Sequence, residues 1–262
     1  MEGLITRFVK NGFYCEGIKM TIYVSHGEKG GVGKSRLAMV LVDYLLVHGR
    51  NVVVVEGDKS GADVGMRYRE IVETAFLNLN RPDAMEEAFS DLTNALEGFG
   101  DADIVVNLPG QASDTLDQFA DMFAAVADAL GHDLVIFYSI GNLDMHVDNL
   151  AKSLKGGLMG VAKPEHRIVV RGEISGNPEN FAWQSSGVRQ AFLQTGGSET
   201  VMPKIRMDAL EKKVREIRGG YTAMTQTASQ LTLGERFLLQ RWLIPAHECV
   251  AAGVLEVDHE RS

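Results

Sequence analysis

A glycine-rich segment at residues 27–35 constrains this chain more than any other feature. It follows an apolar run at residues 20–25 and precedes a stretch with helical spacing, and it reads Gly27-Glu28-Lys29-Gly30-Gly31-Val32-Gly33-Lys34-Ser35. Glycines permit a tight turn that aims backbone N–H groups at phosphate oxygens, a lysine can reach the β- and γ-phosphates, and a serine hydroxyl can hold Mg²⁺. The segment therefore predicts a loop that binds the phosphates of a nucleoside triphosphate.

The loop departs at two neighbouring positions from the usual phosphate-loop pattern, G-x-x-x-x-G-K-[ST]. Glu28 stands at the position of the first glycine in that pattern, and Lys29 adds a second lysine. Residues 29–35 resemble the deviant Walker A loop, K-G-G-x-G-K-[ST], of the ParA/MinD family of ATPases. The resemblance implies ATP and Mg²⁺ as cofactors and a homodimer in the ATP state, in which Lys29 reaches the partner's phosphates and acts in catalysis with Lys34. By the same resemblance, the nucleotide contacts Glu28, Lys29, Gly30, Gly31, Val32, Gly33, Lys34, Ser35 and Arg36, and Ser35 binds the metal.

Short apolar runs alternate with helical patterns after the loop. The runs lie at residues 52–55, 104–106, 134–138 and 168–170, and the helical patterns lie at 34–48, 83–96, 113–130 and 144–154. Such alternation predicts an α/β fold with a doubly wound, mostly parallel sheet. Further along, the pattern predicts a strand at 200–203 and helices at 207–217 and 232–243, the last of them ended by Pro245.

A second motif closes the predicted strand at 52–55. Asp58 lies 24 residues after Lys34, which is the spacing of the second acid of the D-x-D segment in the ParA/MinD family. The resemblance implies that Asp58 orients or activates the attacking water and assists the metal, with Glu56 in place of the first acid. Lys59-Ser60 replaces the Pro-Gln that follows in the family.

Two later positions complete the expected site. Walker B is expected to be an apolar strand ending in Asp, but residues 103–107 end in Asn107, which brings no charge to the metal's second shell. We therefore expect slow hydrolysis or weak Mg²⁺ binding, and Asn107→Asp is expected to raise turnover. Pro203 resembles the family's proline beside the adenine, although a strand-ending proline is also an ordinary stop signal.

Composition limits the remaining possibilities. The chain has 262 residues, 45% of them hydrophobic, with no linker of low complexity, so one domain is expected at 20–262. Residues 1–19 are either an appendage or the result of a misplaced start, and they lack the features of a signal peptide. Two cysteines cannot form a disulfide framework or an iron–sulfur site, which favours a reduced, cytoplasmic setting.

The sequence says less about which surface binds a further partner, such as DNA, a membrane or another protein. Lys212, Lys213, Arg215 and Arg218 could form a patch for nonspecific DNA binding, but a solvated helix face is the simpler interpretation. The acidic end of the chain argues against a membrane anchor, and the basic and aromatic segment 236–244 is better explained as a core helix. We expect an ATP-dependent dimerising switch with weak hydrolysis that acts in DNA partition or positioning, together with an adaptor protein. The alternative is a membrane- or protein-directed regulatory switch with little hydrolysis, such as a conjugation accessory or a division-type positioning protein.

Overall fold

The computed structural model describes residues 20–27, 30–59, 61–110 and 113–259. Its centre is a seven-stranded sheet in the order β3-β2-β4-β1-β5-β6-β7, in which every neighbouring pair is parallel. The predicted α/β fold is therefore confirmed. The strands are β1 (Thr21–His26), β2 (Val52–Glu56), β3 (Thr74–Phe76), β4 (Asp103–Asn107), β5 (Asp133–Ile140), β6 (Arg167–Gly172) and β7 (Ser198–Met202).

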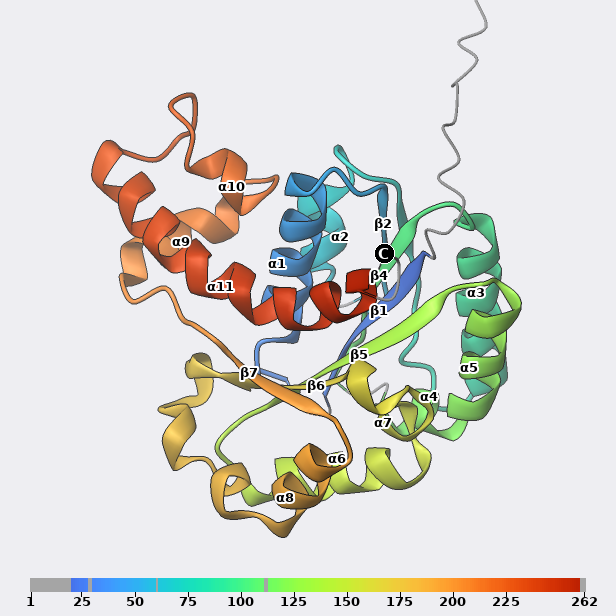
Figure 1. Ribbon diagram of the computed structural model, residues 1–262. Helices are drawn as coiled ribbons and strands as arrows, with labels where there is room; N and C mark the ends of the chain where they lie inside the picture. Colours follow the sequence, from blue (N-terminus) through green and yellow to red (C-terminus); the bar gives the residue numbers. More distant parts are fainter. Residues whose placement is uncertain (1–19, 28–29, 60, 111–112, 260–262) are drawn as a thin grey trace, which may run out of the picture.

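Helices cover both faces of the sheet (Figure 1). One layer holds α1 (Lys34–Val47), α2 (Asp63–Tyr68), α9 (Asp208–Glu216), α10 (Tyr221–Met224) and α11 (Leu233–His259). The opposite layer holds α3 (Met85–Gly98), α4 (Ser113–Gln118), α5 (Ala120–Ala129), α6 (Asp144–Gly156), α7 (Leu158–Val161) and α8 (Gly187–Gln194). Short 3₁₀ turns lie at Pro164–His166, Glu173–Ser175, Pro178–Asn180 and Ala182–Ser185.

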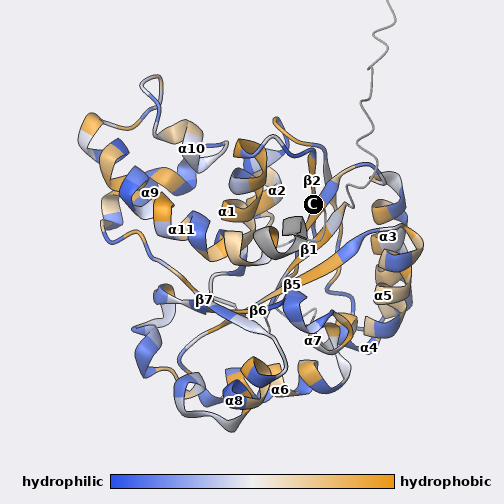
Figure 2. Cartoon of the chain, in the orientation of Figure 1, coloured by the Kyte–Doolittle hydropathy of each residue, from blue (hydrophilic) through white to orange (hydrophobic). Residues whose placement is uncertain are grey.

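The continuous apolar strands follow from this double coverage. Val52 and Val54 pack into the core beneath α1, whereas Val53 and Val55 pack into the core on the other face. Successive side chains of a strand point to opposite faces, so a strand buried on both faces needs apolar residues at every position. Figure 2 shows apolar central strands, such as β5, between helices that carry both polar and apolar residues, whereas the edge strand β7 is more polar.

The layer that carries α3–α8 differs from the sequence-based prediction at one helix. The pattern at 113–130 forms two helices, with Phe119 between them in a non-helical conformation. The Phe119 ring stacks on Phe89 of α3 at a centroid distance of 5.0 Å. Periodicity alone did not indicate the break. The pattern also missed β3 and α2, which are short and have little periodicity.

The prediction that Pro245 ends the last long helix is wrong. Helix α11 continues through Pro245 to His259. Its buried face consists of Leu239, Trp242, Leu243, Ala246, Cys249, Val250 and Val254, each at most 7% exposed. A proline in a helix interior costs about 3 kcal/mol, whereas burying each large apolar side chain contributes about 1.5–3 kcal/mol. The packing on both sides of Pro245 therefore outweighs the local penalty. No helix within the described residues, α11 included, is both long and apolar enough to cross a bilayer.

Pro245→Ala tests this balance. Alanine restores the N–H that can bond the carbonyl of Arg241, while the more flexible unfolded chain offsets about 1 kcal/mol of the gain. We expect the free energy of unfolding to rise by about 1–2 kcal/mol, measured by denaturant titration. Glu248→Ala, at an exposed position of the same helix, is the control and should change stability by less than about 0.5 kcal/mol. A less stable Pro245→Ala variant would contradict this explanation.

Candidate functional site

The glycine-rich loop connects β1 to α1 at the centre of the sheet. Gly31 and Gly33 have φ angles of 89° and 102°, which favour glycine, and Gly33 caps α1. The first intrahelical bond runs from the Leu37 N–H to the Gly33 carbonyl (2.9 Å). The N–H groups of the first turn before Leu37 have no acceptor within the helix, so the positive end of α1 is open to an anion. Glu28 and Lys29 lie outside the described residues.

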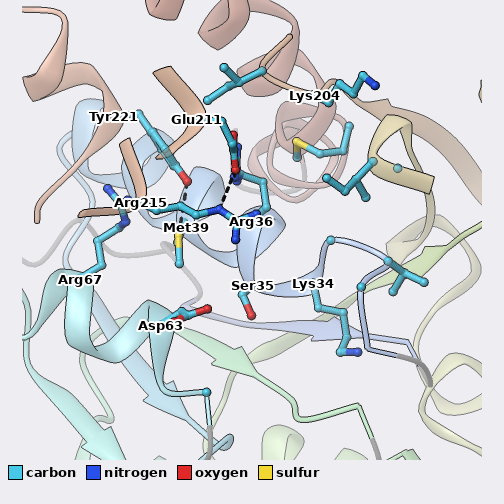
Figure 3. Close-up of a pocket in the computed structure, with 18 of the residues that line it drawn as sticks. Lys34, Ser35, Arg36, Met39, Asp63, Arg67, Lys204, Glu211, Arg215 and Tyr221 are labelled. Atoms are coloured by element: carbon cyan, nitrogen blue, oxygen red, sulfur yellow. Dashed lines mark hydrogen bonds and ion pairs between the residues drawn. The ribbon is translucent and has the colours of Figure 1, made fainter. Parts of the chain in front are cut away.

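A cleft of about 830 Å³ opens on this loop at the carboxyl ends of the strands, where parallel α/β sheets bind ligands. It brings together residues from distant parts of the chain (Figure 3). Of the predicted site residues, the cleft is lined by Gly30, Gly31, Val32, Gly33, Lys34, Ser35, Arg36, Asp58 and Pro203. The structure therefore places the late-strand proline in the same cleft as the loop. Asn107 does not line it.

Lys34 is a buried cation in the lining of the cleft. The residue is only 7% exposed. This burial lowers the pKa of its ammonium group to about 8, although the nearby Asp58 carboxylate acts in the opposite direction. Desolvation disfavours the charged form of a lysine, and a polyanion in the cleft would favour it.

The carboxylate of Glu56 is buried beneath the cleft, with the residue 1% exposed. Its Oε1 accepts hydrogen bonds from the Asp58 N–H (3.1 Å) and from Nδ2 of Asn107 (2.8 Å). Its Oε2 accepts from the N–H groups of Val64 (3.1 Å) and Gly65 (3.0 Å) at the start of α2. Burial raises the pKa of Glu56, and these four donors oppose the shift.

The Asn107 amide nitrogen therefore donates to the Glu56 carboxylate. It is 1% exposed, it lies beside Glu56 in the β2–β4 register, and its Oδ1 has no hydrogen-bond partner within the described part of the chain. The structure changes the expected effect of Asn107→Asp, because an acid here would face Glu56 at hydrogen-bonding distance. Loss of folding stability is the expected result, in place of a gain in turnover.

The side chain of Arg36 points away from the loop. Its guanidinium pairs with Glu211 of α9 and lies over the rings of Trp242 (5.6 Å) and Tyr221 (6.0 Å). Only the backbone of Arg36 is therefore left to contact a phosphate. The side chain instead links α1 to the three C-terminal helices.

The predicted basic cluster divides between two surfaces. Arg215 and Arg218 line the cleft, whereas Lys212 and Lys213 do not. Lys213 pairs with Glu235 (2.6 Å), Arg215 pairs with Glu211 (2.8 Å), and Arg218 donates to the Met66 carbonyl. Lys213, Arg215 and Arg218 are nevertheless exposed, so these cations remain accessible to an anion.

Sequence reasoning missed Asp63, an exposed residue that begins α2 and lines the cleft. The available signal was an acid at the start of a helix soon after Gly61, which is common at helix starts and carries no functional information by itself. Within the described residues, no group of three or more His, Cys, Asp or Glu side chains could hold a metal ion. The residues fit a Mg²⁺ ion that arrives with phosphate oxygens, because such ions need only one or two protein oxygens. Ser35, Asp58 and Asp63 line the cleft and offer them.

Comparisons with known proteins find a distant relative by sequence and similar folds among solved structures. No family model matches the chain. The chain is 26% identical to a protein named MobD from Acidithiobacillus ferrooxidans over 222 residues. The matched region covers 85% of this chain and 92% of MobD.

Solved structures with a similar arrangement include the two that follow. The signal recognition particle receptor FtsY from Elizabethkingia anophelis is 11% identical, with a TM-score of 0.45 over 87% of this chain and 67% of that one. A nucleotide-binding protein from Archaeoglobus fulgidus, solved with ADP, is 12% identical, with a TM-score of 0.43 over 73% and 84% of the two chains. The chain's own loop, sheet order and helix placement make its fold P-loop NTPase-like.

Asn107→Asp should destabilise the protein by about 1–3 kcal/mol at neutral pH, because two buried carboxylates would then meet. The pair would share a proton, so the folded variant would bind more protons than the unfolded chain. Its stability deficit should therefore be largest at pH 8 and smaller at pH 5. Denaturant unfolding at the two pH values measures this dependence.

The matched control is the double variant Glu56→Gln/Asn107→Asp. It exchanges donor and acceptor across the pair and should recover part of the lost stability. An Asn107→Asp variant as stable as the parent at pH 8 would contradict the hydrogen bond between the two side chains.

Proposed function

We propose that the protein is a Mg²⁺- and ATP-dependent molecular switch that hydrolyses ATP slowly. The observation that carries the proposal is the loop itself. The first turn of α1 presents its backbone N–H groups, Lys34 and Ser35 to one cleft, and Asp58 and Pro203 line the same cleft. A triphosphate satisfies all of these groups at once, since each phosphate oxygen can accept an N–H donor or bind the metal.

Each side chain has a separate part in this proposal. The Lys34 ammonium group binds the β- and γ-phosphates, and the Ser35 hydroxyl binds Mg²⁺, which neutralises charge that develops on the transferred phosphoryl group. Asp58 orients the water that attacks the γ-phosphate, and Pro203 borders the base. Slow hydrolysis is expected because Asn107, which carries no charge, occupies the end of β4.

The switch is proposed to act as a dimer. Lys29, whose place in the loop resembles the signature lysine of the ParA/MinD family, would reach the partner's phosphates. The proposed use is partition or positioning of DNA, with Lys212, Lys213, Arg215 and Arg218 as the phosphate contacts and an adaptor protein as activator. Lys212 and Lys213 are the better candidates of the four, because they do not line the nucleotide cleft.

A second candidate is a regulatory switch in conjugation that responds to nucleotide occupancy more than to turnover. The uncharged Asn107, tied to Glu56 at 2.8 Å, favours this alternative because it argues for a long-lived ATP state. MobD offers a direct comparison in the same assays, since the similarity extends over 92% of that protein.

Lys29→Ala tests the dimerising switch. The parent should become dimeric with a slowly hydrolysed ATP analogue and stay monomeric with ADP, as measured by sedimentation velocity. The variant should bind the analogue and remain monomeric, because it lacks the cation that reaches the partner's phosphates. In the same samples, random-sequence duplex DNA should bind only the parent dimer and more weakly as salt rises.

The control for DNA binding is Lys152→Glu, which changes an exposed cation of α6 on the opposite helical layer. It should bind DNA as the parent does, whereas Lys212→Glu should weaken binding. A Lys29→Ala variant that still dimerises with the analogue would contradict the switch. A parent dimer without affinity for DNA would favour the conjugation alternative.

The lowered pKa of Lys34 predicts that ATP affinity decreases at high pH. Below about pH 8 the ammonium group is already charged in the free protein, whereas above it a proton must be taken up with the nucleotide. The dissociation constant of a fluorescent ATP analogue should therefore rise about tenfold per pH unit above 8. Lys34→Arg, whose guanidinium stays charged, should bind with little dependence on pH in this range.

Unfolding does not produce the same trend through Lys34. The unfolded chain keeps the lysine proton up to a higher pH than the folded chain does. Lys34 therefore makes folding more favourable as pH rises from about 8 toward 10.5, the ordinary pKa of a lysine. Constant affinity of the parent from pH 7 to pH 9.5 would contradict the role of Lys34.

A further inference from the structure

The connection between β2 and α2 is held by one buried carboxylate. Each oxygen of Glu56 accepts two hydrogen bonds, which occupies the acceptor positions that a carboxylate offers. Glu56 is therefore unavailable to a cation, and so is the Asn107 amide nitrogen that bonds to it. Neither of the two strand-end side chains beneath the loop can bring negative charge into the cleft.

The same carboxylate determines where α2 begins. Two of its bonds go to Val64 and Gly65. A side chain at Gly65 would lie 2.6 Å from the Phe76 ring and 2.9 Å from Cβ of Glu56, so α2 packs directly against β2. Asp63, the first residue of α2, is positioned by these contacts.

Asp63 carries a carboxylate on the loop side of the cleft that remains available to a cation. It is exposed, it lines the cleft, and within the described residues its carboxylate makes no hydrogen bond or ion pair. In Figure 3 this carboxylate points toward the Ser35 hydroxyl, on the side of the cleft away from the Lys34 ammonium group. Asp58, by contrast, accepts a hydrogen bond from the Gly61 N–H (3.0 Å).

We propose that Asp63 supplies the negative charge beside the divalent cation that arrives with the nucleotide. Asp63 thus offers a charge from the start of α2, whereas the end of β4 stays uncharged as the proposed slow hydrolysis requires, and the Glu56–Asn107 pair is the support that keeps α2 in place. The proposal rests on the proposed nucleotide binding. It explains why an uncharged residue is acceptable at the end of β4: the amide is needed there as a donor to Glu56, and the acid is carried by the neighbouring helix.

Asp63→Asn tests the assignment through binding alone. A fluorescent ATP analogue is titrated against the full chain in EDTA and at a series of Mg²⁺ concentrations. The parent should bind more tightly as Mg²⁺ rises. The variant should need about tenfold more Mg²⁺ for the same effect, whereas its affinity in EDTA should be unchanged or higher because a negative charge has been removed from beside the phosphates.

The matched control is Asp208→Asn. Asp208 is likewise an exposed first residue of a helix, and it lines the same cleft on the α9 side. The control removes the same charge from the cleft and the same favourable interaction with a helix N-terminus. It should leave the Mg²⁺ dependence as in the parent.

Several results would overturn the assignment. They are an Asp63→Asn variant with the parent's Mg²⁺ dependence, an equal shift in Asp208→Asn, and a Glu56→Gln/Asn107→Asp variant that needs less Mg²⁺ than the parent. The last result would return the metal's acid to the end of β4. A parent that binds no nucleotide with or without Mg²⁺ would instead refute the proposed function, and this inference with it.

Discussion

The carboxylate of Glu56 is the group on which the geometry of this site depends. Burying an ionised carboxylate is costly unless hydrogen bonds replace the lost water. Here Asn107 and three backbone N–H groups provide them, and the donors come from β4, from the turn after β2 and from the start of α2. Removing one donor would leave an acceptor of a buried carboxylate unsatisfied. The carboxylate therefore links β2, β4 and the start of α2 through hydrogen bonds.

The other side of the cleft is held by an independent set of contacts. Arg36 of α1 pairs with Glu211 of α9 and lies over Trp242 of α11, whose indole N–H donates to the Pro203 carbonyl (3.0 Å). The first turn of α1 is thus connected through Trp242 to the segment at Pro203, which lines the same cleft. These contacts join α1 to the C-terminal helices and to Pro203.

The buried faces of the C-terminal helices explain how two unfavourable features are tolerated. Pro245 lies in the middle of α11, yet the helix continues because its apolar residues on both sides pack against α1 and the sheet. Arg67 of α2 is buried, and its guanidinium donates to the Gly219 carbonyl (2.9 Å) and lies over Tyr221 at 4.8 Å. In both cases long-range packing offsets a local cost.

Local chemistry made the sheet and the loop predictable from the sequence. The alternation of strands and helices and the segment from Gly30 to Ser35 depend on residues that are neighbours in the chain, and the structure agrees with both. The same is true of the spacing that places Asp58 in the cleft. The helix through Pro245, the break at Phe119 and the pairing of Glu56 with Asn107 were decided by tertiary structure, because each depends on contacts between segments far apart in the sequence. Asp63 belongs to this second group. An acid at a helix start becomes a candidate metal partner only because Glu56 holds the start of α2 in place and because the strand register pairs Glu56 with Asn107, which leaves neither side chain to the cation.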